Sequence, residues 1–387
     1  MRTVHILKQS LSSFLQAIHL SRLETVFWAV SALLRGGRLS LTCLGRAGAG
    51  RGAPKHAIKR CDRLLGNKHL RGELSLFYRA IAHSLLKNNS RPLVLIDWTR
   101  IEPKHVALVA SVPLQGRSLP LYLEVHSEKL DSNRKVMSRF LGRLKSILPA
   151  GCTPIIVTDA GFRNHWFRAI YNLGWDYVGR LRNKPDVCPA DGFQWSTLKE
   201  LYRFARSTPE DLGLWIISRS NSWTSRVIAF RKRKFAKKPE PAIGSATLKR
   251  RRKMKEPWLL ATSLNQHTAK QIVTIYSKRM QIEETFRDAK NHRFGWSFRH
   301  ARTNDEKRYE VMLLIATIAM FVAFLTGCTG EKEGLQRRYQ ANTTRNRRVL
   351  SLVYLGCALL CDGFEMTAEQ HRQSLANLRK VTEVNDG

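Results

Sequence analysis

The chain has 387 residues, of which 43% are hydrophobic and 25% are charged. This apolar content can fill a sizeable core, so wholesale disorder is excluded, and the length suits two or three domains or one large domain with insertions. Lys and Arg number 66 against 30 Asp and Glu, a net charge of +36. This excess favours a polyanionic partner, because cations set against phosphates release condensed counterions. A ribosome-like structural role or a solubilising surface is the alternative.

Seven cysteines are scattered along the chain without a Cys-x-x-Cys pair. Their odd number, their spacing and the lack of a secretory leader predict reduced thiols in the cytoplasm and argue against a structural zinc site. The longest apolar run, 311–325, is shorter than the ~20 residues that span a bilayer. We therefore expect a buried core helix there and no membrane segment.

Residues 1–88 are predicted to form a helical DNA-binding domain. The apolar residues that recur there at helical spacing are Leu11, Phe14, Leu15, Ile18, Leu23, Val26, Phe27 and Val30. The glycine-rich segment 45–55 is expected to be a loop, with Pro54 near the start of the next helix. The helix after it, 56–72, is basic through Lys59, Arg60, Arg63 and Lys68. These features fit a DNA-binding module and also any basic helical bundle.

Residues 89–182 are predicted to form the first part of an α/β core. The expected strands are 91–98, 105–111, 119–127, 153–162 and 176–182, and the expected helices are 131–149 and a segment around Trp166. The order strand-strand-strand-helix-strand-helix-strand predicts a mixed sheet with helices on its faces.

Residues 183–256 are predicted to be a β-rich insertion with short strands at 214–220 and 226–231. Residues 231–255 contain 12 Lys or Arg and one acid, which predicts a basic loop that is solvated or holds DNA. The core then resumes over 257–330, with a strand at 257–263 that leads into a helix over 271–291. A helical C-terminal region, 331–387, follows. It is basic and helical around 345–360, as an assembly or DNA-contact segment would be.

The helix over 271–291 carries a polar stripe beside an apolar one. At about 100° per residue the stripe covers an arc of roughly 60° and consists of Tyr276, Arg279, Glu283 and Lys290. Glu284 and Asp288 point well off it. A carboxylate, two cations and a phenol in line suit metal-bound phosphate chemistry. The alternative is an exposed face on which Arg279 and Glu283 form an i,i+4 pair.

Two aspartates stand at the predicted ends of strands, Asp97 after the first and Asp159 after the fourth. Ligands gather at strand ends in open sheets, so these acids could converge with Glu283. Three carboxylates suit Mg²⁺ or Mn²⁺, and two ions ~3.5–4 Å apart would clamp an in-line phosphoryl displacement. Alternatively, Asp97 begins a turn with Thr99, and Asp159 forms an Asx turn before Gly161 and caps the next helix.

The spacing Y-x2-R-x3-E-x6-K over 276–290, with DAGF at 159–162 and EPWLLATS at 256–263, resembles the bacterial cut-and-paste DDE transposases of insertion-sequence family four. The resemblance covers nearly the whole chain. It implies an RNase H-like core with a β-strand insertion between the second Asp and the Glu. The strand order and the interruption at 183–256 agree with this fold independently.

By this resemblance, Asp97, Asp159 and Glu283 hold two Mg²⁺ ions, for which Mn²⁺ can substitute. Tyr276, Arg279 and Lys290 contact phosphates of the transposon end, and Trp258 holds a flipped base. The alternative for Trp258 is a core tryptophan of the strand at 257–263.

The implied reaction nicks DNA, forms a hairpin and transfers the strand to target DNA. Its partners are the terminal inverted repeats, target DNA and a second copy of the chain in a synaptic homodimer, in the bacterial cytoplasm with the nucleoid. A catalytically inactive DNA-binding regulatory relic and another RNase H-like nuclease remain alternatives.

Overall fold

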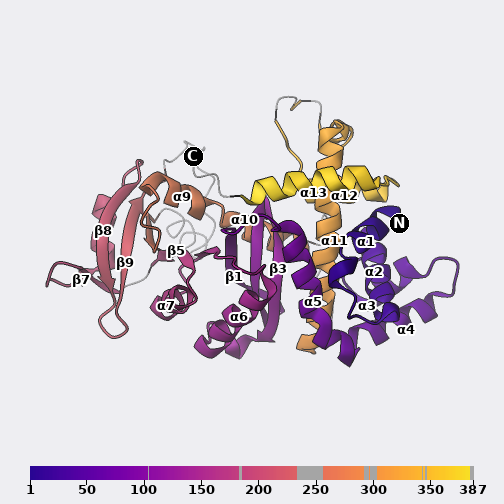
Figure 1. The fold of residues 1–387 in the computed structure, drawn as a ribbon, viewed down its shortest axis with the longest axis horizontal. Coiled ribbons are helices and arrows are strands. Elements are labelled where there is room, and N and C mark those ends of the chain that lie inside the picture. The colour runs from indigo at the N-terminus through magenta and orange to yellow at the C-terminus, as the bar shows by residue number, and fades with distance from the viewer. Residues whose placement is uncertain are drawn as a thin grey trace, which may run out of the picture. The chain divides into compact units, whose positions relative to one another are not determined.

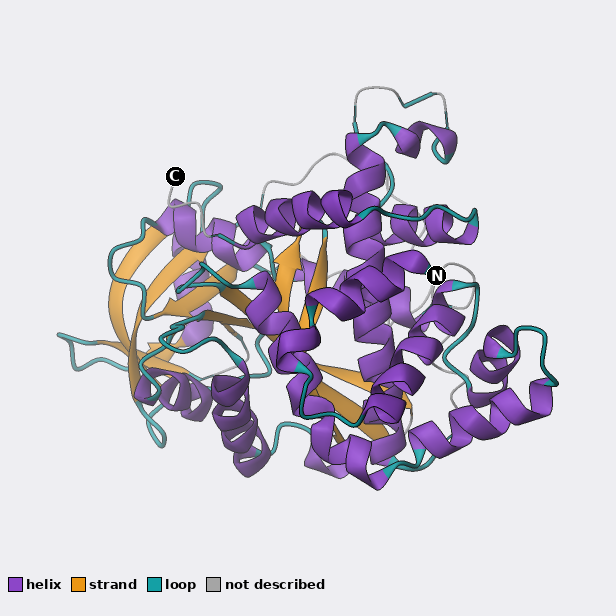
Figure 2. Ribbon diagram, turned by 45° about the vertical axis from the view of Figure 1, so that its right-hand side comes forward, coloured by secondary structure: helices purple, strands orange, loops and turns teal. Residues whose placement is uncertain are grey.

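The computed structural model describes residues 1–102, 104–182, 185–232, 256–291, 296, 303–341, 343–344 and 347–383. By their contacts these residues form two compact units. The first comprises Met1–Cys152 and the described chain from Met280 onward, and the second comprises Thr153–Arg279. Figures 1 and 2 show the helices and strands of these units.

The first unit contains an antiparallel meander, formed by β1 (Leu93–Glu102), β2 (His105–Leu114) and β3 (Arg117–Ser127). β2, the middle strand, is buried along its whole length. β2 and β3 are joined by a tight turn at Gln115 and Gly116, whose φ angles are 45° and 96°. Two consecutive residues of positive φ match the twist of the strands that such a turn connects.

Helices cover both faces of this meander. Tyr122 of β3 packs against Tyr78 of α5 (Lys68–Leu85) and Phe140 of α6 (Arg134–Ile147). The next residue, Leu123, faces the opposite side and lines a cavity with α10 (Met280–Lys290) and α11 (Glu306–Lys332).

The outward amides of β3, an edge strand, are also bonded by these two helices. Ser118 donates to Thr285 Oγ1 of α10 at 2.8 Å, and Val125 donates to Glu310 Oε1 of α11 at 3.2 Å. Bonded edge amides cannot pair with another chain, which protects the edge.

α11 is the core helix of the first unit. Its 27 residues include the predicted apolar run 311–325, so that prediction is confirmed. By length and composition the helix could cross a membrane, but 89% of its apolar window is buried inside the protein. It contacts α2 (Leu20–Leu34), α5 and β3, and near the C-terminus α12 (Leu352–Cys361) and α13 (Ala368–Thr382). These contacts explain why the middle of α11 is apolar on all sides.

The N-terminal part is helical as predicted. Its other helices are α1 (Arg2–Ser10), η1 (Ser12–Phe14), α3 (Leu41–Gly48) and α4 (Pro54–Leu65). All of the apolar positions named above are buried except Phe14, which is 38% exposed. α4 begins at Pro54 as expected, whereas Lys68 opens α5 and does not continue the basic helix.

The loop predicted at 45–55 is partly wrong, because α3 continues through Gly48. A Cβ at Gly45 would lie 2.5 Å from Ile58 Cα, and one at Gly48 would lie 2.4 Å from the Trp28 ring. The glycines therefore allow helices to approach closely rather than ending α3.

In the second unit the strand order is β4-β5-β10-β9-β8-β6-β7. β4 and β5 are parallel and the other pairs are antiparallel. The elements are β4 (Ile155–Thr158), α7 (Asn164–Asn172), β5 (Asp176–Leu181), β6 (Asp186–Pro189), β7 (Ser196–Thr197), η3 (Leu198–Phe204), β8 (Glu210–Ile217), β9 (Trp223–Phe230), β10 (Trp258–Thr262) and α9 (Ala269–Ser277). The mixed α/β class and the predicted strands of the insertion are confirmed.

The basic loop lies outside the described residues from position 233 to 255. The helix expected around 345–360 begins only at Leu352, after the short helix η5 (Leu335–Arg338), and residues 345 and 346 also lie outside the described chain. The seven cysteines form no disulfide.

Candidate active site

Asp97 lies in the middle of β1. The four strand residues before it are buried, whereas Asp97 itself is half-buried. We expected the strand to end at this acid, but β1 continues to Glu102 because its backbone keeps pairing with β2 past Asp97, which lies opposite Val109. Side chains alternate across a strand, so Asp97 shares a face of β1 with Thr99.

The single helix predicted over 271–291 is two helices. α9 ends at Ser277 and α10 begins at Met280. Between them the amides of Lys278 and Arg279 bond to carbonyl oxygens three residues back, a tighter turn than that of an α-helix. The segment contains no glycine or proline, so nothing in the sequence marks this break.

The expected stripe is therefore wrong as a single helical surface. Tyr276 of α9 and Arg279, in the turn after α9, belong to the second unit, and Glu283 and Lys290 belong to α10 in the first. Within α10, Glu283 and Lys290 still lie in line as predicted, because two helical residues seven positions apart differ in direction by only about 20°. Glu283 and Lys290 thus share one flank of α10.

The other flank of α10 is held by the β2–β3 turn and the start of β3. Gln281 Oε1 accepts a hydrogen bond from the Gly116 amide at 3.1 Å. Asp288 pairs with Arg117 at 2.6 Å, and Glu284 lies 3.8 Å from the same guanidinium. The two competing acids therefore face away from the flank that carries Glu283.

The Glu283 flank lies toward β1. Lys290 Nζ donates a hydrogen bond to Thr99 Oγ1 at 2.6 Å, and Glu283 itself is exposed. Asp97 and Thr99 lie on the same face of β1. The Lys290–Thr99 bond therefore places the flank of α10 with Glu283 and Lys290 against the face of β1 that carries Asp97.

In the second unit, Asp159 directly follows β4. Its Oδ1 accepts a hydrogen bond from the Gly161 amide at 2.8 Å, which is the Asx turn anticipated from the sequence. The expected cap is absent, because α7 has Arg163 at its N-cap and no side-chain cap bond. Asp159 thus stands at the carboxyl end of a parallel strand, where ligands gather in α/β sheets.

Tyr276 is the centre of a charged cluster in the second unit. It is 3% exposed, and Trp258 packs edge-on against its ring with centroids 4.8 Å apart. The pKa of the Tyr276 hydroxyl is raised, chiefly by burial. The charges of Arg279 and Arg180 act to lower this pKa, and the charge of Asp159 acts to raise it. The phenol therefore lies within reach of two guanidinium charges and the Asp159 carboxylate.

Arg180 was not among the predicted site residues. On β5 it lies opposite Leu260, and its Nη2 donates to the carbonyl oxygens of Glu256 and Pro257 at 3.3 and 3.4 Å. Its buried Nε has no hydrogen-bond partner among the described residues. A cation between apolar residues of a buried strand was the only sequence signal that could have identified it.

Trp258 is the first residue of β10 and is half-buried. Besides Tyr276, its ring contacts Phe230 of β9 with centroids 5.6 Å apart. The tryptophan thus packs against the charged cluster rather than deep in the core.

Within the described residues, no three His, Cys, Asp or Glu side chains form a group that could hold a metal ion. Asp97 and Glu283 belong to the first unit and Asp159 to the second. By donor chemistry the three carboxylates suit a hard divalent cation such as Mg²⁺.

Residues 89–321 match the family model described as "Transposase DDE domain", which covers more than half of the chain. The matched segment contains all seven predicted site residues, from Asp97 to Lys290. None of the curated proteins compared with the chain matches it. The chain therefore belongs to the transposase DDE domain family.

Proposed function

We propose that the chain is a DNA transposase that excises and inserts its own element by cut-and-paste transposition. Within its family we assign it to bacterial insertion-sequence family four, most like the transposase of the tetracycline-resistance composite transposon. The Y-x2-R-x3-E-x6-K signature with the DAGF and EPWLLATS segments supports this assignment. The proposed reaction order is nicking, hairpin formation and strand transfer.

We propose an RNase H-like fold for the catalytic core. The succession β1, β2, β3, α6, β4, α7 and β5, which matches the predicted order, supports it. The proposed domains keep the sequence-based boundaries 1–88, 89–182, 183–256, 257–330 and 331–387. We further propose a homodimer on paired DNA ends, in the cytoplasm with the nucleoid.

One observation carries the proposal most directly: Lys290 donates to Thr99 on the β1 face that bears Asp97. It supports a site in which Asp97 and Glu283 act together, because Glu283 shares the Lys290 flank of α10. Asp159 joins them by the family resemblance.

In this proposal Asp97, Asp159 and Glu283 hold two Mg²⁺ ions, or Mn²⁺ in their place. When bound, such ions activate the attacking oxygen and stabilise the leaving oxygen of a phosphodiester. The chain's own cations position the DNA strand. Lys290, fixed by Thr99, would bind phosphates together with Arg279 and Tyr276, as the resemblance implies. Arg279 and Arg180 both act on the buried Tyr276 hydroxyl.

Glu283→Gln tests the function. It keeps the shape of the side chain but removes its charge, so Mg²⁺-dependent cleavage of a duplex carrying the element's end should fall by roughly a thousandfold or more. Binding of the same duplex in a gel-shift assay should not change.

Glu284→Gln is the matched control, because Glu284 is the next residue and faces Arg117 and Arg287. It should cut at the normal rate. Undiminished cutting by Glu283→Gln, or equal loss in both variants, would refute the assignment of Glu283.

A further inference from the structure

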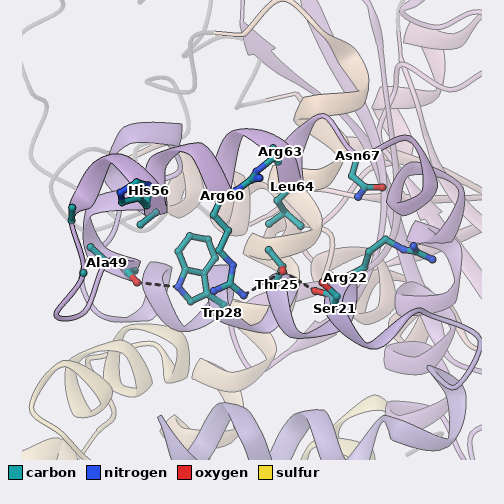
Figure 3. A pocket seen from close by; sticks show the side chains of 14 residues that line it. Ser21, Arg22, Thr25, Trp28, Ala49, His56, Arg60, Arg63, Leu64 and Asn67 are labelled. Carbon is teal, nitrogen blue, oxygen red and sulfur yellow. Dashed lines mark hydrogen bonds between the residues drawn. The ribbon is translucent and has the colours of Figure 1, made fainter.

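Away from the candidate active site, the first unit has a large cavity between α2 and α4 and an unusual turn between β2 and β3. The cavity has a volume of about 660 Å³, and in it the Arg60 guanidinium stacks over the Trp28 ring (Figure 3). It lies within residues 1–88, for which the sequence already predicts DNA binding. The turn, in contrast, has contacts that reach from α10 to the chain before α12.

Gln115, the first residue of this turn, holds a backbone conformation that favours glycine or asparagine. Its φ angle is 45°, and that of Gly116 is 96°. Two-residue hairpin turns of this kind prefer Asn or Gly at the first position, because a larger side chain crowds the backbone at positive φ. A glutamine here opposes the local preference, and such strain points to a role for its side chain.

Arg348 bonds both the side chain and the backbone of Gln115. Arg348 Nη1 donates to Gln115 Oε1 at 2.9 Å, and Nη2 donates to the Gln115 carbonyl oxygen at 2.8 Å. The planar guanidinium thus binds two oxygens of one residue, which fixes the side chain relative to the backbone. Arg348 also lies 3.5 Å from Glu331 in the last turn of α11. It therefore joins the β2–β3 turn to the end of α11.

The three residues after Gln115 bond α10. The contacts are Gly116 with Gln281, Arg117 with Asp288, and Ser118 with Thr285, at 3.1, 2.6 and 2.8 Å. All three partners lie on the flank of α10 away from Glu283, since they differ from it in direction by more than about 120°. A continuous series of bonds therefore runs from Arg348 through the turn to α10.

We propose that Arg348 is a positioning residue for α10. By holding Gln115 it fixes the β2–β3 turn, and the turn fixes the rotation of α10, whose opposite flank presents Glu283 and Lys290 to β1. Arg348 precedes Ser351, the N-cap of α12, by three residues, so the C-terminal region is coupled to the candidate site. The inference rests on the proposed function in taking α10 as the helix that carries a metal ligand.

Gln115→Gly separates positioning from stability. Glycine suits a positive φ better than glutamine, so the denaturant midpoint of unfolding should stay the same or rise. The variant also removes the Oε1 that Arg348 binds, so hydrogen exchange of the α10 amides should accelerate by about tenfold. Single-turnover cleavage of the transposon-end duplex at saturating DNA should slow by about tenfold as well. A purely structural role would move stability and cleavage in the same direction.

Arg348→Gln removes the other partner of the same bonds. It should accelerate α10 exchange and slow cleavage at least as much as Gln115→Gly does. The double variant Gln115→Gly/Arg348→Gln should behave like Arg348→Gln alone, because the link is already broken. Arg372→Gln is the matched control, since it removes the same charge from an exposed pair with Glu369 on α13. Its α10 exchange and its cleavage rate should be normal.

Normal α10 exchange in both Gln115→Gly and Arg348→Gln would overturn the inference. Losses that multiply in the double variant would also overturn it, as would normal cleavage by both single variants when Glu283→Gln has lost cleavage. Failure of the proposed function gives a different result. Glu283→Gln would then cut normally, while α10 exchange would still accelerate in the two variants that break the Arg348 link.

Discussion

Lys290 and Thr99 show how one hydrogen bond can align a candidate site within a unit. The bond fixes the rotation of α10 against β1, and that rotation decides which acids of the helix face the strand. Glu283 lies on this flank, whereas Glu284 and Asp288 face Arg117. Because Glu283 lies seven residues before Lys290, it shares the Lys290 flank of the helix, and its neighbours do not.

Trp258 is a residue whose role can be tested kinetically. If it holds a flipped base, Trp258→Ala should slow hairpin formation more than first-strand nicking, because only the hairpin needs the extruded base. Both steps can be timed in one gel assay with an end-labelled duplex. Trp258→Phe keeps an aromatic ring against Tyr276 and should retain most of the hairpin rate. Equal slowing of both steps by the alanine variant would favour a purely structural tryptophan.

Glu124 is a buried acid outside the proposed catalytic residues, and it is 2% exposed. Burial alone would raise the pKa of its carboxyl, but the His126 ring, whose Nε2 lies 3.1 Å from Oε2, and hydrogen bonds from Tyr122 and Arg143 outweigh burial and lower that pKa to about 2. Since the folded pKa lies below the ordinary value of 4.5, the unfolded state binds more protons between these values. Glu124 therefore stabilises the fold fully above pH 4.5, and this contribution is lost as the pH falls toward 2.

Glu124→Gln should lower the free energy of unfolding at pH 7 by roughly 3 kcal/mol, at 1.36 kcal/mol per unit of pKa. The difference from the unmodified chain should shrink as the pH falls, as measured by denaturant unfolding at several pH values. Glu128→Gln, in an exposed pair with Arg100, should change stability little. A pH-independent difference for Glu124→Gln would contradict the ionic account.

The helices and strands themselves were largely predictable. Alternating and continuous apolar runs identified β1 to β5, and the 3.6-residue period identified α6 and the core of α11. The break between α9 and α10 was not predictable, since Lys278 and Arg279 are ordinary helix formers. The helical course of α3 was hidden because Gly45 and Gly48 serve close packing against Ile58 and Trp28, a tertiary cause that local sequence does not reveal.

At the scale of elements, α10 depends on Thr285 for its attachment to β3. The buried Oγ1 accepts from the Ser118 amide at 2.8 Å. Thr285→Val leaves that amide without its partner and should cost about 1–3 kcal/mol of stability. Hydrogen exchange of the α10 amides should accelerate. Thr274→Val, at an exposed position on α9, should leave α10 exchange unchanged, and normal exchange in Thr285→Val would show that other contacts hold the helix.

For the whole molecule, the sequence predicted a polyanionic partner from a net charge of +36, and the family match agrees with DNA as that partner. Three candidate acids could be selected by their positions on strands and a helix. Their assignment to two compact units was not foreseen, because units are defined by contacts between segments distant in sequence. Arg180 was also missed, since its role depends on the Tyr276 cluster around it.

The central claim is that Asp97, Asp159 and Glu283 act as one metal-binding site. The most direct test measures single-turnover cleavage of the transposon-end duplex in Mg²⁺ for Asp97→Asn, Asp159→Asn, Glu283→Gln and the double variant Asp97→Asn/Asp159→Asn. Groups that act as a unit are not additive, so each single variant should fall to the same residual rate and the double variant should fall no further. Normal cleavage by Asp159→Asn, or losses that multiply in the double variant, would contradict the account.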